Sequence, residues 1–430
     1  MATRRPFTGA DAPSIRLIDQ CIQCGQCLET CPTYSVTRRE DASPRGRLWL
    51  MHKAAEGELE ISPTFRDQMW LCLDCRACET ACPVGVQFGR LMEESRGEVA
   101  RTLPQGPFER AWKWLLLRAV LPNRRALRVA GHLARAWRYL DPRGRLASRL
   151  PGTIRRLTGI IPSRSSAPFL PAREGSAGPA DGEPAVFFSG CIMPEMFGGV
   201  HRATIQVLGA AGYRIRTPAR QGCCGALHAH AGEREQAKAL ARQVIAALGE
   251  GSEPIILNSA GCGAMLKEYR LLFEHDPAWS DRAARFSARV RDVSQVLAGR
   301  PLPFARPLDR TVTYDAPCHL LHGQKVSREP LDLLGAVPGI RLVPLRDADR
   351  CCGSAGIYNL LQPAMSDELL RQKVAAIRAT GAGIVATGNP GCLLQIDGGL
   401  RAAGLDVTVV HPLELLAGAL RRDGEGASHR

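Results

Sequence analysis

The sequence predicts an α + α/β protein, in which an N-terminal α-helical module precedes two duplicated α/β cysteine-rich domains. Two observations lead to this prediction. Two cysteine runs with identical spacing lie near the N-terminus, separated by a spacer of helical character. Further along, cysteine landmarks recur at near-constant offsets, each after a short apolar run, with helical segments between them. Strands that alternate with helices indicate α/β units with parallel sheets.

Both N-terminal runs read C-x2-C-x2-C-x3-C-P and contain eight cysteines: Cys21, Cys24, Cys27, Cys31, Cys72, Cys75, Cys78 and Cys82. This run wraps four-iron, four-sulfur clusters in bacterial-type ferredoxins, where the fourth cysteine ligates the other cluster. We therefore expect one [4Fe-4S] cluster on Cys21, Cys24, Cys27 and Cys82, and a second on Cys72, Cys75, Cys78 and Cys31. Zinc is the alternative, because CxxC also suits tetrahedral zinc. Two matched runs, each followed by proline, favour iron and sulfur.

The spacer between the two runs predicts two helices, so residues 1–100 are expected to form a helical ferredoxin domain. Ser43 is a candidate N-cap and Pro44 suits the first helical turn. A second helix is expected over 64–71. Arg45 and Arg47 either offset the negative charge of a cluster or are solvated charges near a helix start; we expect the second.

Composition limits the class of protein and its location. A chain of 430 residues should hold two to three domains. The first residues lack the apolar run of a secretory signal, and no apolar stretch is long enough to span a membrane. Clustered cysteines in a reducing compartment indicate metal ligands rather than disulfides. We expect a cytoplasmic protein, with peripheral attachment to the cytoplasmic face of the inner membrane as an option.

Residues 101–162 form a basic segment with helical, amphipathic character. Between 101 and 160, fourteen Arg and Lys are opposed only by Glu109 and Asp141, interleaved with tryptophans and leucines. Such a segment suits an anionic membrane surface or an acidic partner subunit. No nucleic-acid motif accompanies the charge, so nucleic acid is not expected as a partner. Residues 163–184 are rich in Ser, Pro, Gly and Ala, which predicts a linker.

The duplicated domains are expected over 185–300 and 305–420, followed by a tail at 421–430. The landmarks pair as Cys191 with Cys318, Cys223-Cys224-Gly225 with Cys351-Cys352-Gly353, and Cys262 with Cys392. Cysteines at strand ends lie where α/β folds place ligand sites. The eight cysteines therefore predict a further cluster or redox site, and we expect cluster ligation in at least one copy. Buried structural cysteines and a redox-active vicinal pair are the alternatives.

These motifs together resemble the iron–sulfur subunit of bacterial glycolate oxidase. The similarity covers nearly the whole chain and includes Asp41-Ala42-Ser43-Pro44-Arg45-Gly46-Arg47 and Val84-Gly85-Val86-Gln87-Phe88-Gly89-Arg90-Leu91. Parts of the pattern are shared with the iron–sulfur subunits of anaerobic glycerol-3-phosphate dehydrogenase, with lactate-utilisation proteins and with heterodisulfide reductase, and complexes of these kinds are the alternative assignment.

The resemblance implies an electron-transfer subunit of an oxidoreductase acting on CH–OH donors. Flavin-binding partner subunits, which carry FAD, would oxidise glycolate to glyoxylate, and this chain would pass the electrons toward the respiratory chain. The sequence has no G-x-G-x-x-G after a predicted strand, so we expect no flavin site and no catalysis on the hydroxy acid here.

One departure from heterodisulfide reductase-like units concerns the end of each repeat. Those units end in C-x-x-C, whereas Met265 and Gln395 stand at these positions, leaving four thiols per copy. An unusual non-cubane cluster is therefore not expected. Two rival hypotheses are a self-sufficient thiol–disulfide reductase using the vicinal pairs and a zinc-stapled nucleic-acid-binding protein built on 101–160.

Overall fold

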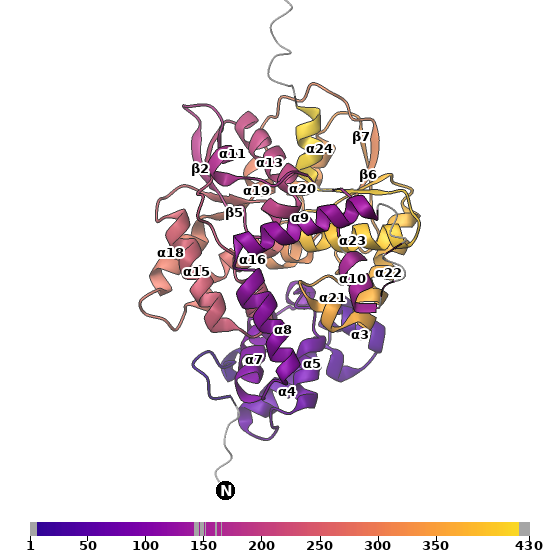
Figure 1. Ribbon diagram of the computed structural model, residues 1–430. Coiled ribbons are helices and arrows are strands. Elements are labelled where there is room, and N and C mark those ends of the chain that lie inside the picture. The colour runs from indigo at the N-terminus through magenta and orange to yellow at the C-terminus, as the bar shows by residue number, and fades with distance from the viewer. Residues whose placement is uncertain are drawn as a thin grey trace, which may run out of the picture.

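The computed structural model describes residues 7–420, apart from 142–145, 147–149, 151, 160 and 165. A helical module lies at one end of the molecule and two α/β units lie side by side above it (Figure 1). This arrangement confirms the predicted fold class. The predicted tail at 421–430 lies outside the described residues. Among the described residues, no helix combines the length and apolar character needed to cross a membrane.

The N-terminal module consists of short helices around a small core. Its elements are α1 (Ile15–Ile18), α2 (Cys27–Thr30), α3 (Pro32–Thr37), η1 (Glu40–Ala42), α4 (Pro44–Glu56), α5 (Pro63–Leu71), α6 (Ala77–Ala81) and α7 (Phe88–Thr102). Ser43 caps α4 by accepting a hydrogen bond from the Gly46 amide at 2.9 Å, and Ser62 caps α5. Gly46 has no room for a side chain, because an added Cβ would collide with the Glu40 carbonyl oxygen. The two spacer helices are thus present, and their Met51 and Met69 lie in one core with Leu91 of α7.

The basic segment forms α8 (Pro107–Lys113), the π-helical turn η2 (Trp114–Val120), α9 (Arg124–Leu140) and α10 (Gly152–Gly159). Helix α9 runs across both α/β units (Figure 1). Arg124 donates to the Ala219 carbonyl of the first unit at 2.6 Å, and Arg156 in α10 pairs with Asp367 of the second. Residues 166–177 add α11 (Pro171–Glu174) and strand β1 (Ser176–Ala177), and Phe169 is buried, so much of the segment expected to be a linker packs against the first unit.

The first α/β unit contains a five-stranded sheet in the order β1-β3-β2-β4-β5, parallel except for β1. Its strands are β2 (Glu183–Phe187), β3 (Tyr213–Arg216), β4 (Ile255–Leu257) and β5 (Val290–Asp292). Its helices are α12 (Met193–Met196), α13 (Gly198–Ala210), α14 (Ala226–His230), α15 (Arg234–Leu248), α16 (Ala260–Lys267), α17 (Tyr269–Leu272), α18 (Ser280–Arg289) and α19 (Val293–Leu297).

The second unit repeats this topology with a parallel sheet in the order β7-β6-β8-β9. Its strands are β6 (Arg310–Tyr314), β7 (Ile340–Val343), β8 (Ile384–Ala386) and β9 (Thr408–Val410). Its helices are η4 (His319–Gly323), α20 (Glu329–Gly335), α21 (Tyr358–Leu361), α22 (Pro363–Ala379), α23 (Pro390–Ala402) and α24 (Pro412–Ala419). In both sheets the first strand, β2 or β6, lies between the next two strands of its unit. The connections from these strands therefore leave in opposite directions, which creates a topological switch point, a common ligand site, at the carboxyl ends of the strands.

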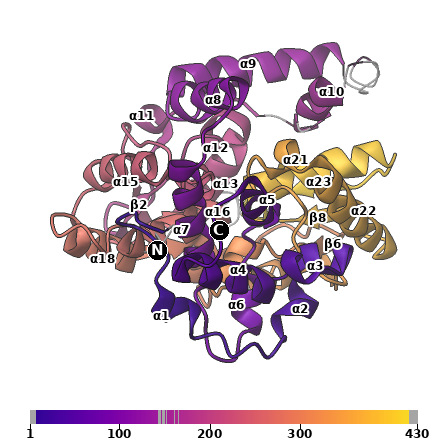
Figure 2. The same ribbon diagram turned by 90° about the horizontal axis from the view of Figure 1, so that it is seen from below.

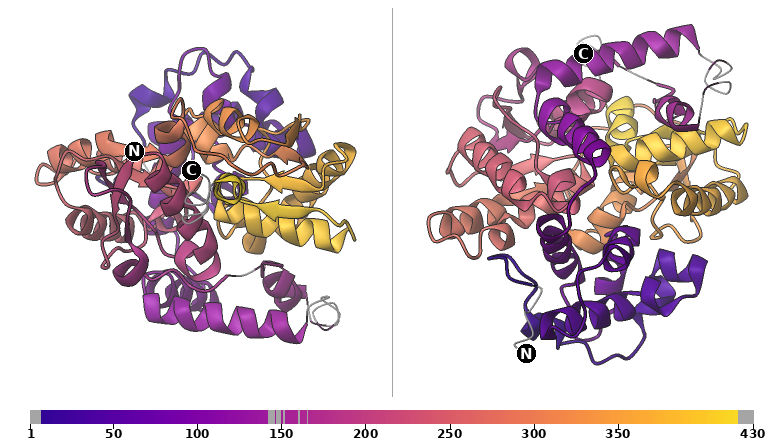
Figure 3. Two further views of the ribbon diagram at one scale, coloured as in Figure 1. Left: turned by 90° about the horizontal axis from the view of Figure 1, so that it is seen from above. Right: turned by 60° about the horizontal axis from the view of Figure 1, so that its bottom comes forward.

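The two units lie against one another (Figure 3). They share one hydrophobic core. Helix α13 packs on α24, and α19 packs on α20. In each pair, a helix that follows the first strand of one unit contacts the helix that follows the last strand of the other. The core joins Phe187 and Leu208 of the first unit to Leu334 and Leu416 of the second.

A series of buried hydrogen bonds also joins the two units. The side-chain amide of Asn258 donates to His201 Nδ1 at 3.1 Å. The backbone carbonyl of Asn258 accepts from His411 Nε2, in the second unit, at 3.0 Å. Burial lowers the pKa of His201 to about 3 and that of His411 to about 4. Both imidazoles are therefore neutral in the folded protein at neutral pH.

Acid should destabilise this contact. Because both folded pKa values lie below the usual histidine value, the stability is complete above about pH 6.5 and is lost as the pH falls, by up to roughly 1.4 kcal/mol per unit for each histidine. Denaturant unfolding followed by circular dichroism from pH 7 to 5 measures this loss, which His411→Gln should reduce. His275→Gln, at an exposed site, is the control. Identical pH dependence in His411→Gln and the wild type would contradict the assignment.

Candidate metal centres

The second cysteine run forms a buried group with the last cysteine of the first run. Cys31, Cys72, Cys75 and Cys78 are each less than a tenth exposed. Burial raises the pKa of the Cys78 thiol, and the nearby thiols of Cys75, Cys72 and Cys31 raise it further. Helices α2 and α6, which contain the third cysteine of each run, pack against one another. The structure thus brings together the four cysteines expected to share a cluster.

The other four cysteines lie around a cleft at the edge of the module. Cys21, Cys24, Cys27 and Cys82 line it, and Cys78 of the second group lines it as well. Burial raises the pKa of Cys27 to about 11, with Cys21 and Cys31 as further causes. Cys24 is exposed and is the only one of the sixteen cysteines in that class. Both predicted groupings are therefore compatible with the geometry.

The backbone of the two runs curls in the same way. Residues at equivalent positions adopt left-handed conformations: Gln23 and Asp74 with φ of 56° and 54°, and Gly25 and Arg76 with φ of 81° and 64°. These conformations turn amides toward sulfur, as where the Asp74 amide lies 3.3 Å from Cys72 Sγ. Four thiols at each of two sites, with the Asp74 amide directed at sulfur in the second, fit a cubane cluster in donor type and number.

Two buried arginines lie beside the second group. The Arg47 guanidinium is fully buried and donates to the Thr33 hydroxyl at 3.2 Å, and that hydroxyl lies 3.3 Å from Cys31 Sγ. Arg96 donates to the carbonyls of Cys72 and Met69. Burial raises the pKa of Cys72, while Arg47 and Arg96 oppose that rise. The expectation that Arg47 is a solvated charge was wrong, because helix α4 directs it into the core.

In the first α/β unit, cysteines after three neighbouring strands meet at the carboxyl edge of the sheet. Cys191 follows β2, Cys223 and Cys224 follow β3, and Cys262 lies at the start of α16 after β4. The sulfurs of Cys224 and Cys262 are 3.4 Å apart. Gly225 has φ of 86°, and its amide lies 3.5 Å from Cys223 Sγ. The hydrogen bond between Cys191 and Cys223 raises the pKa of Cys191 and lowers that of Cys223.

The second unit repeats the group with Cys318, Cys351, Cys352 and Cys392, but its surroundings are more polar. The Gly353 amide lies 3.4 Å from Cys351 Sγ. Buried Lys373 pairs with Asp315 at 2.8 Å and contributes to lowering the pKa of Cys352. Asn389 lies between the two groups, since its Nδ2 is 3.6 Å from Cys392 Sγ and its Oδ1 accepts from the Gly261 amide at 3.1 Å.

The second cysteine run is in contact with both α/β units. His319 Nε2 donates to the Asp74 carbonyl at 2.9 Å, and His230 Nδ1 lies 3.1 Å from the Asp74 carboxylate and 2.9 Å from Glu93. The two carboxylates raise the pKa of His230 to about 9 against the effect of burial. The nearby Cys318 thiol contributes to raising the pKa of Cys75. The second cysteine group of the module thus adjoins the cysteine group of the second unit.

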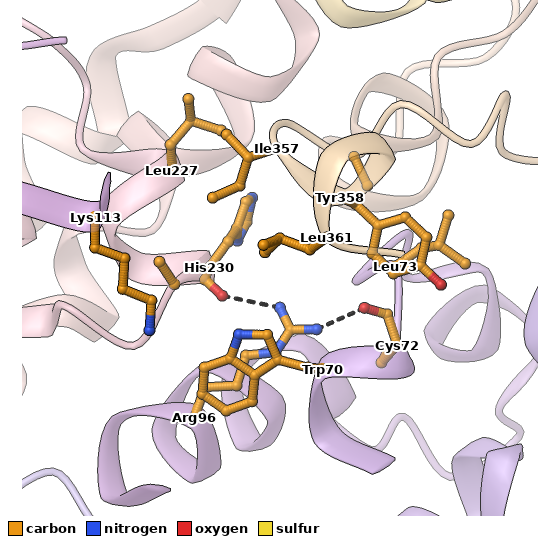
Figure 4. A pocket seen from close by; sticks show the side chains of 12 residues that line it. Trp70, Cys72, Leu73, Arg96, Lys113, Leu227, His230, Ile357, Tyr358 and Leu361 are labelled. Carbon is orange, nitrogen blue, oxygen red and sulfur yellow. Dashed lines mark hydrogen bonds between the residues drawn. The ribbon is translucent and has the colours of Figure 1, made fainter. Parts of the chain in front are cut away.

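A pocket marks the place where these parts meet (Figure 4). Trp70, Cys72 and Arg96 line it from the N-terminal module, Lys113 from α8, His230 from the first unit and Tyr358 from the second. Arg96 donates to the His230 carbonyl at 3.0 Å, and the Tyr358 hydroxyl donates to the Leu71 carbonyl at 2.8 Å. Sequence reasoning missed Asp74, His230 and His319, because no spacing rule links residues so far apart.

Known proteins are similar to this chain in its domains and over most of its length. A 4Fe-4S dicluster domain matches residues 17–86, and a cysteine-rich domain matches 185–267 and 312–397. A probable glycolate oxidase iron-sulfur subunit of Bacillus subtilis is 38% identical over 415 residues, covering 92% of each chain. The chain belongs to the family of glycolate oxidase iron–sulfur subunits. The glycolate oxidase iron-sulfur subunit of Escherichia coli is 29% identical over 95% of each chain.

Membership of the glycolate oxidase iron–sulfur subunit family identifies an iron–sulfur electron-transfer subunit of an oxidoreductase complex. A lactate utilization protein A of Shouchella clausii is 30% identical but aligns with only 53% of this chain, covering 96% of its own length. The full-length similarity to the glycolate oxidase subunits therefore agrees better with the whole architecture. The two matches of the cysteine-rich domain contain all eight cysteines of the two α/β units.

Replacing Arg96 should loosen the attachment of the second cysteine run. Arg96→Met leaves the buried carbonyls of Met69, Cys72 and His230 without this donor, which should lower the free energy of unfolding by about 1–3 kcal/mol. Anaerobic denaturant unfolding of the iron-loaded protein measures the change. Arg346→Met, at an arginine whose side chain is 83% exposed, is the matched control. Equal stability of the two variants would show that the Arg96 contacts contribute little.

Proposed function

We propose that this chain transfers electrons within a flavoprotein complex that oxidises glycolate to glyoxylate. Flavin-binding partner subunits with FAD would act on the CH–OH donor, and this chain would not catalyse that oxidation itself. The observation that carries the proposal is the pair of four-cysteine groups in a chain that is related over more than nine tenths of its length to glycolate oxidase iron–sulfur subunits. The proposed location is cytoplasmic.

In this proposal Cys21, Cys24, Cys27 and Cys82 hold one [4Fe-4S] cluster, and Cys31, Cys72, Cys75 and Cys78 hold a second. When bound, such clusters take up and release single electrons. The residues around the second group exclude water, since Leu73 and the three cysteines of its run are buried. Arg47 and Arg96 add positive charge there, which favours the more negative, reduced form and so raises the reduction potential.

We also propose that at least one of the Cys-Cys-Gly groups holds a further cluster. The group of the second unit is favoured, because Cys318 lies beside Cys75 and because buried Lys373 offsets negative charge near Cys352. Each group offers four thiols, which suits an ordinary four-iron cluster.

The protein purified without oxygen should be brown and contain roughly eight or more irons per chain. With glycolate and its flavoprotein subunits, the visible absorbance of the clusters should bleach, and Cys75→Ser should remove about four irons together with the share of the bleaching that the second cluster contributes. Iron analysis and anaerobic spectroscopy measure both. Cys191→Ser is the comparison, since it tests the first Cys-Cys-Gly group and leaves both ferredoxin-type groups complete.

Comparing substrates distinguishes a glycolate-oxidising complex from the other complexes that share these motifs. L-Lactate and glycerol 3-phosphate, each offered with its own flavin subunit, should bleach the clusters poorly. Faster reduction with either of them than with glycolate would overturn the glycolate assignment, and zinc in place of iron would overturn electron transfer.

We further propose that α9 attaches the complex peripherally to an anionic membrane surface. Val129, Leu133, Ala136 and Leu140 are exposed at a spacing that places them on one face of the helix, beside exposed Arg125 and Arg128. An apolar face flanked by arginines suits insertion at the boundary of lipid head groups and acyl chains.

Sedimentation with vesicles tests this attachment. The wild type should bind vesicles that contain phosphatidylglycerol more tightly than neutral ones, and binding should weaken in high salt. Leu133→Glu should reduce the affinity by roughly tenfold or more, because it replaces a leucine whose burial contributes about 1.5–3 kcal/mol. Ile22→Glu, which alters another exposed apolar residue, should bind as the wild type does. Equal vesicle binding by Leu133→Glu and the wild type would contradict the proposal.

A further inference from the structure

The two cysteine runs are alike in spacing and backbone but opposite in exposure. Leu73, between the first two cysteines of the second run, is 5% exposed, whereas Ile22 at the equivalent position is 63% exposed. The next residue but one shows the same contrast, because Cys75 is buried and Cys24 is exposed. A duplicated loop therefore has one covered copy and one open copy.

The chain itself covers the second run. Asp74 is held by His230 and His319 from the two α/β units, and buried Arg76 pairs with Glu268. Thr80, shortly after the third cysteine, receives hydrogen bonds from His322 and Lys325 at 3.0 Å each. These contacts show how a surface engages a loop of this shape. The covering surface buries the apolar residue after the first cysteine, and it forms hydrogen bonds and ion pairs with residues further along the run.

The open run is bordered by apolar side chains. Ile22 and Val84 line the same cleft as the thiols of Cys21, Cys24, Cys27 and Cys82, and Val84 is 43% exposed. Trp49, also exposed, lies one turn along α4 from Arg45, which donates to the Gln23 carbonyl at 3.2 Å. Arg45 is already neutralised by Glu40 at 2.7 Å. We call Ile22, Cys24, Trp49 and Val84 the loop-1 face.

We propose that the loop-1 face is the docking surface for the flavin-bearing subunit and the point where electrons enter this chain. The inference rests on the proposed function and assigns the site of its partner. Electron transfer weakens steeply with distance, so a donor on another chain must approach the cysteine group that reaches the surface. Among the sixteen cysteines that group alone has an exposed member, Cys24. The partner surface is expected to be apolar and nearly uncharged, as in the core of a protein interface.

The electron balance of the exchange is simple. Reduced flavin on the partner is oxidised, and the group held by Cys21, Cys24, Cys27 and Cys82 is reduced by one electron at a time. No bond forms or breaks in this chain, and the flavin protons leave on the partner side. The basic helix α9 is free for a different contact, because it lies at the opposite edge of the molecule from α2 and α6 when seen from below (Figure 2).

Charged substitutions on the loop-1 face test the inference in the iron-loaded chain. Val84→Glu and Trp49→Glu each place a carboxylate on this face without replacing a cysteine, and Ile22→Glu adds a third position inside the run. Each should weaken binding to the purified flavoprotein subunits, measured by biolayer interferometry, by roughly tenfold or more. The glycolate-driven bleaching rate at low partner concentration should fall in parallel. Leu133→Glu on α9, 66% exposed, is the matched control and should bind normally.

Iron content and the dithionite-reduced EPR spectrum show whether each variant still holds its clusters. Weaker partner binding with unchanged iron and EPR spectrum supports the inference. Wild-type affinity in both Val84→Glu and Trp49→Glu overturns it, as does loss of binding in Leu133→Glu alone. If the wild-type chain fails to bind any glycolate-type flavoprotein subunit, the proposed function itself is overturned and the inference falls with it.

Discussion

The contacts of Asp74 with His230 and His319 tie the N-terminal module to both α/β units. Asp74 lies between two cysteines of the second run, is almost fully buried, and has its pKa lowered by His230 despite the opposing effect of burial. A buried carboxylate is stable only with such partners. Because His230 comes from the first α/β unit and His319 from the second, a single loop fixes three parts of the chain relative to one another. The Cys75 and Cys318 thiols lie near one another beside this contact.

Duplication has produced two units with one topology but different electrostatics around their cysteines. Asp315 and Phe188 occupy equivalent positions three residues before the first cysteine of each group, and both are buried. In the second unit Asp315 and Lys373 form an ion pair beside the thiols, whereas the first unit has an aromatic ring there. Any redox groups held by the two units would therefore differ in potential, since nearby charge and polarity set that property.

Structure could be predicted where a motif of a few neighbouring residues determines it, and could not where it depends on contacts between distant segments. The cysteine spacings, Ser43-Pro44 and the repeated Cys-Cys-Gly landmarks each encode structure within a few residues, so the helical module and the two parallel units could be predicted. The burial of Arg47 could not, because its partners Thr33 and Gln68 come from other helices. Composition predicts a linker before β2, yet Phe169 within this segment belongs to the core that the two units share. Composition reports the average character of a segment, whereas its packing depends on single residues such as Phe169 and on contacts such as those of Arg202 with the Ala167 and Pro168 carbonyls.

The shared core between the two units also affects how the chain matures during synthesis. Helix α13 is made early, but its packing partner α24 is among the last described elements to leave the ribosome. Until α24 is made, the apolar residues of α13 and β2 lack their packing partners from the second unit. The first unit must therefore remain incompletely packed while the second is translated. Exposed apolar surface of this kind promotes aggregation of intermediates. Slow translation or limited chaperone supply should therefore reduce the yield of the folded protein more than its thermodynamic stability suggests.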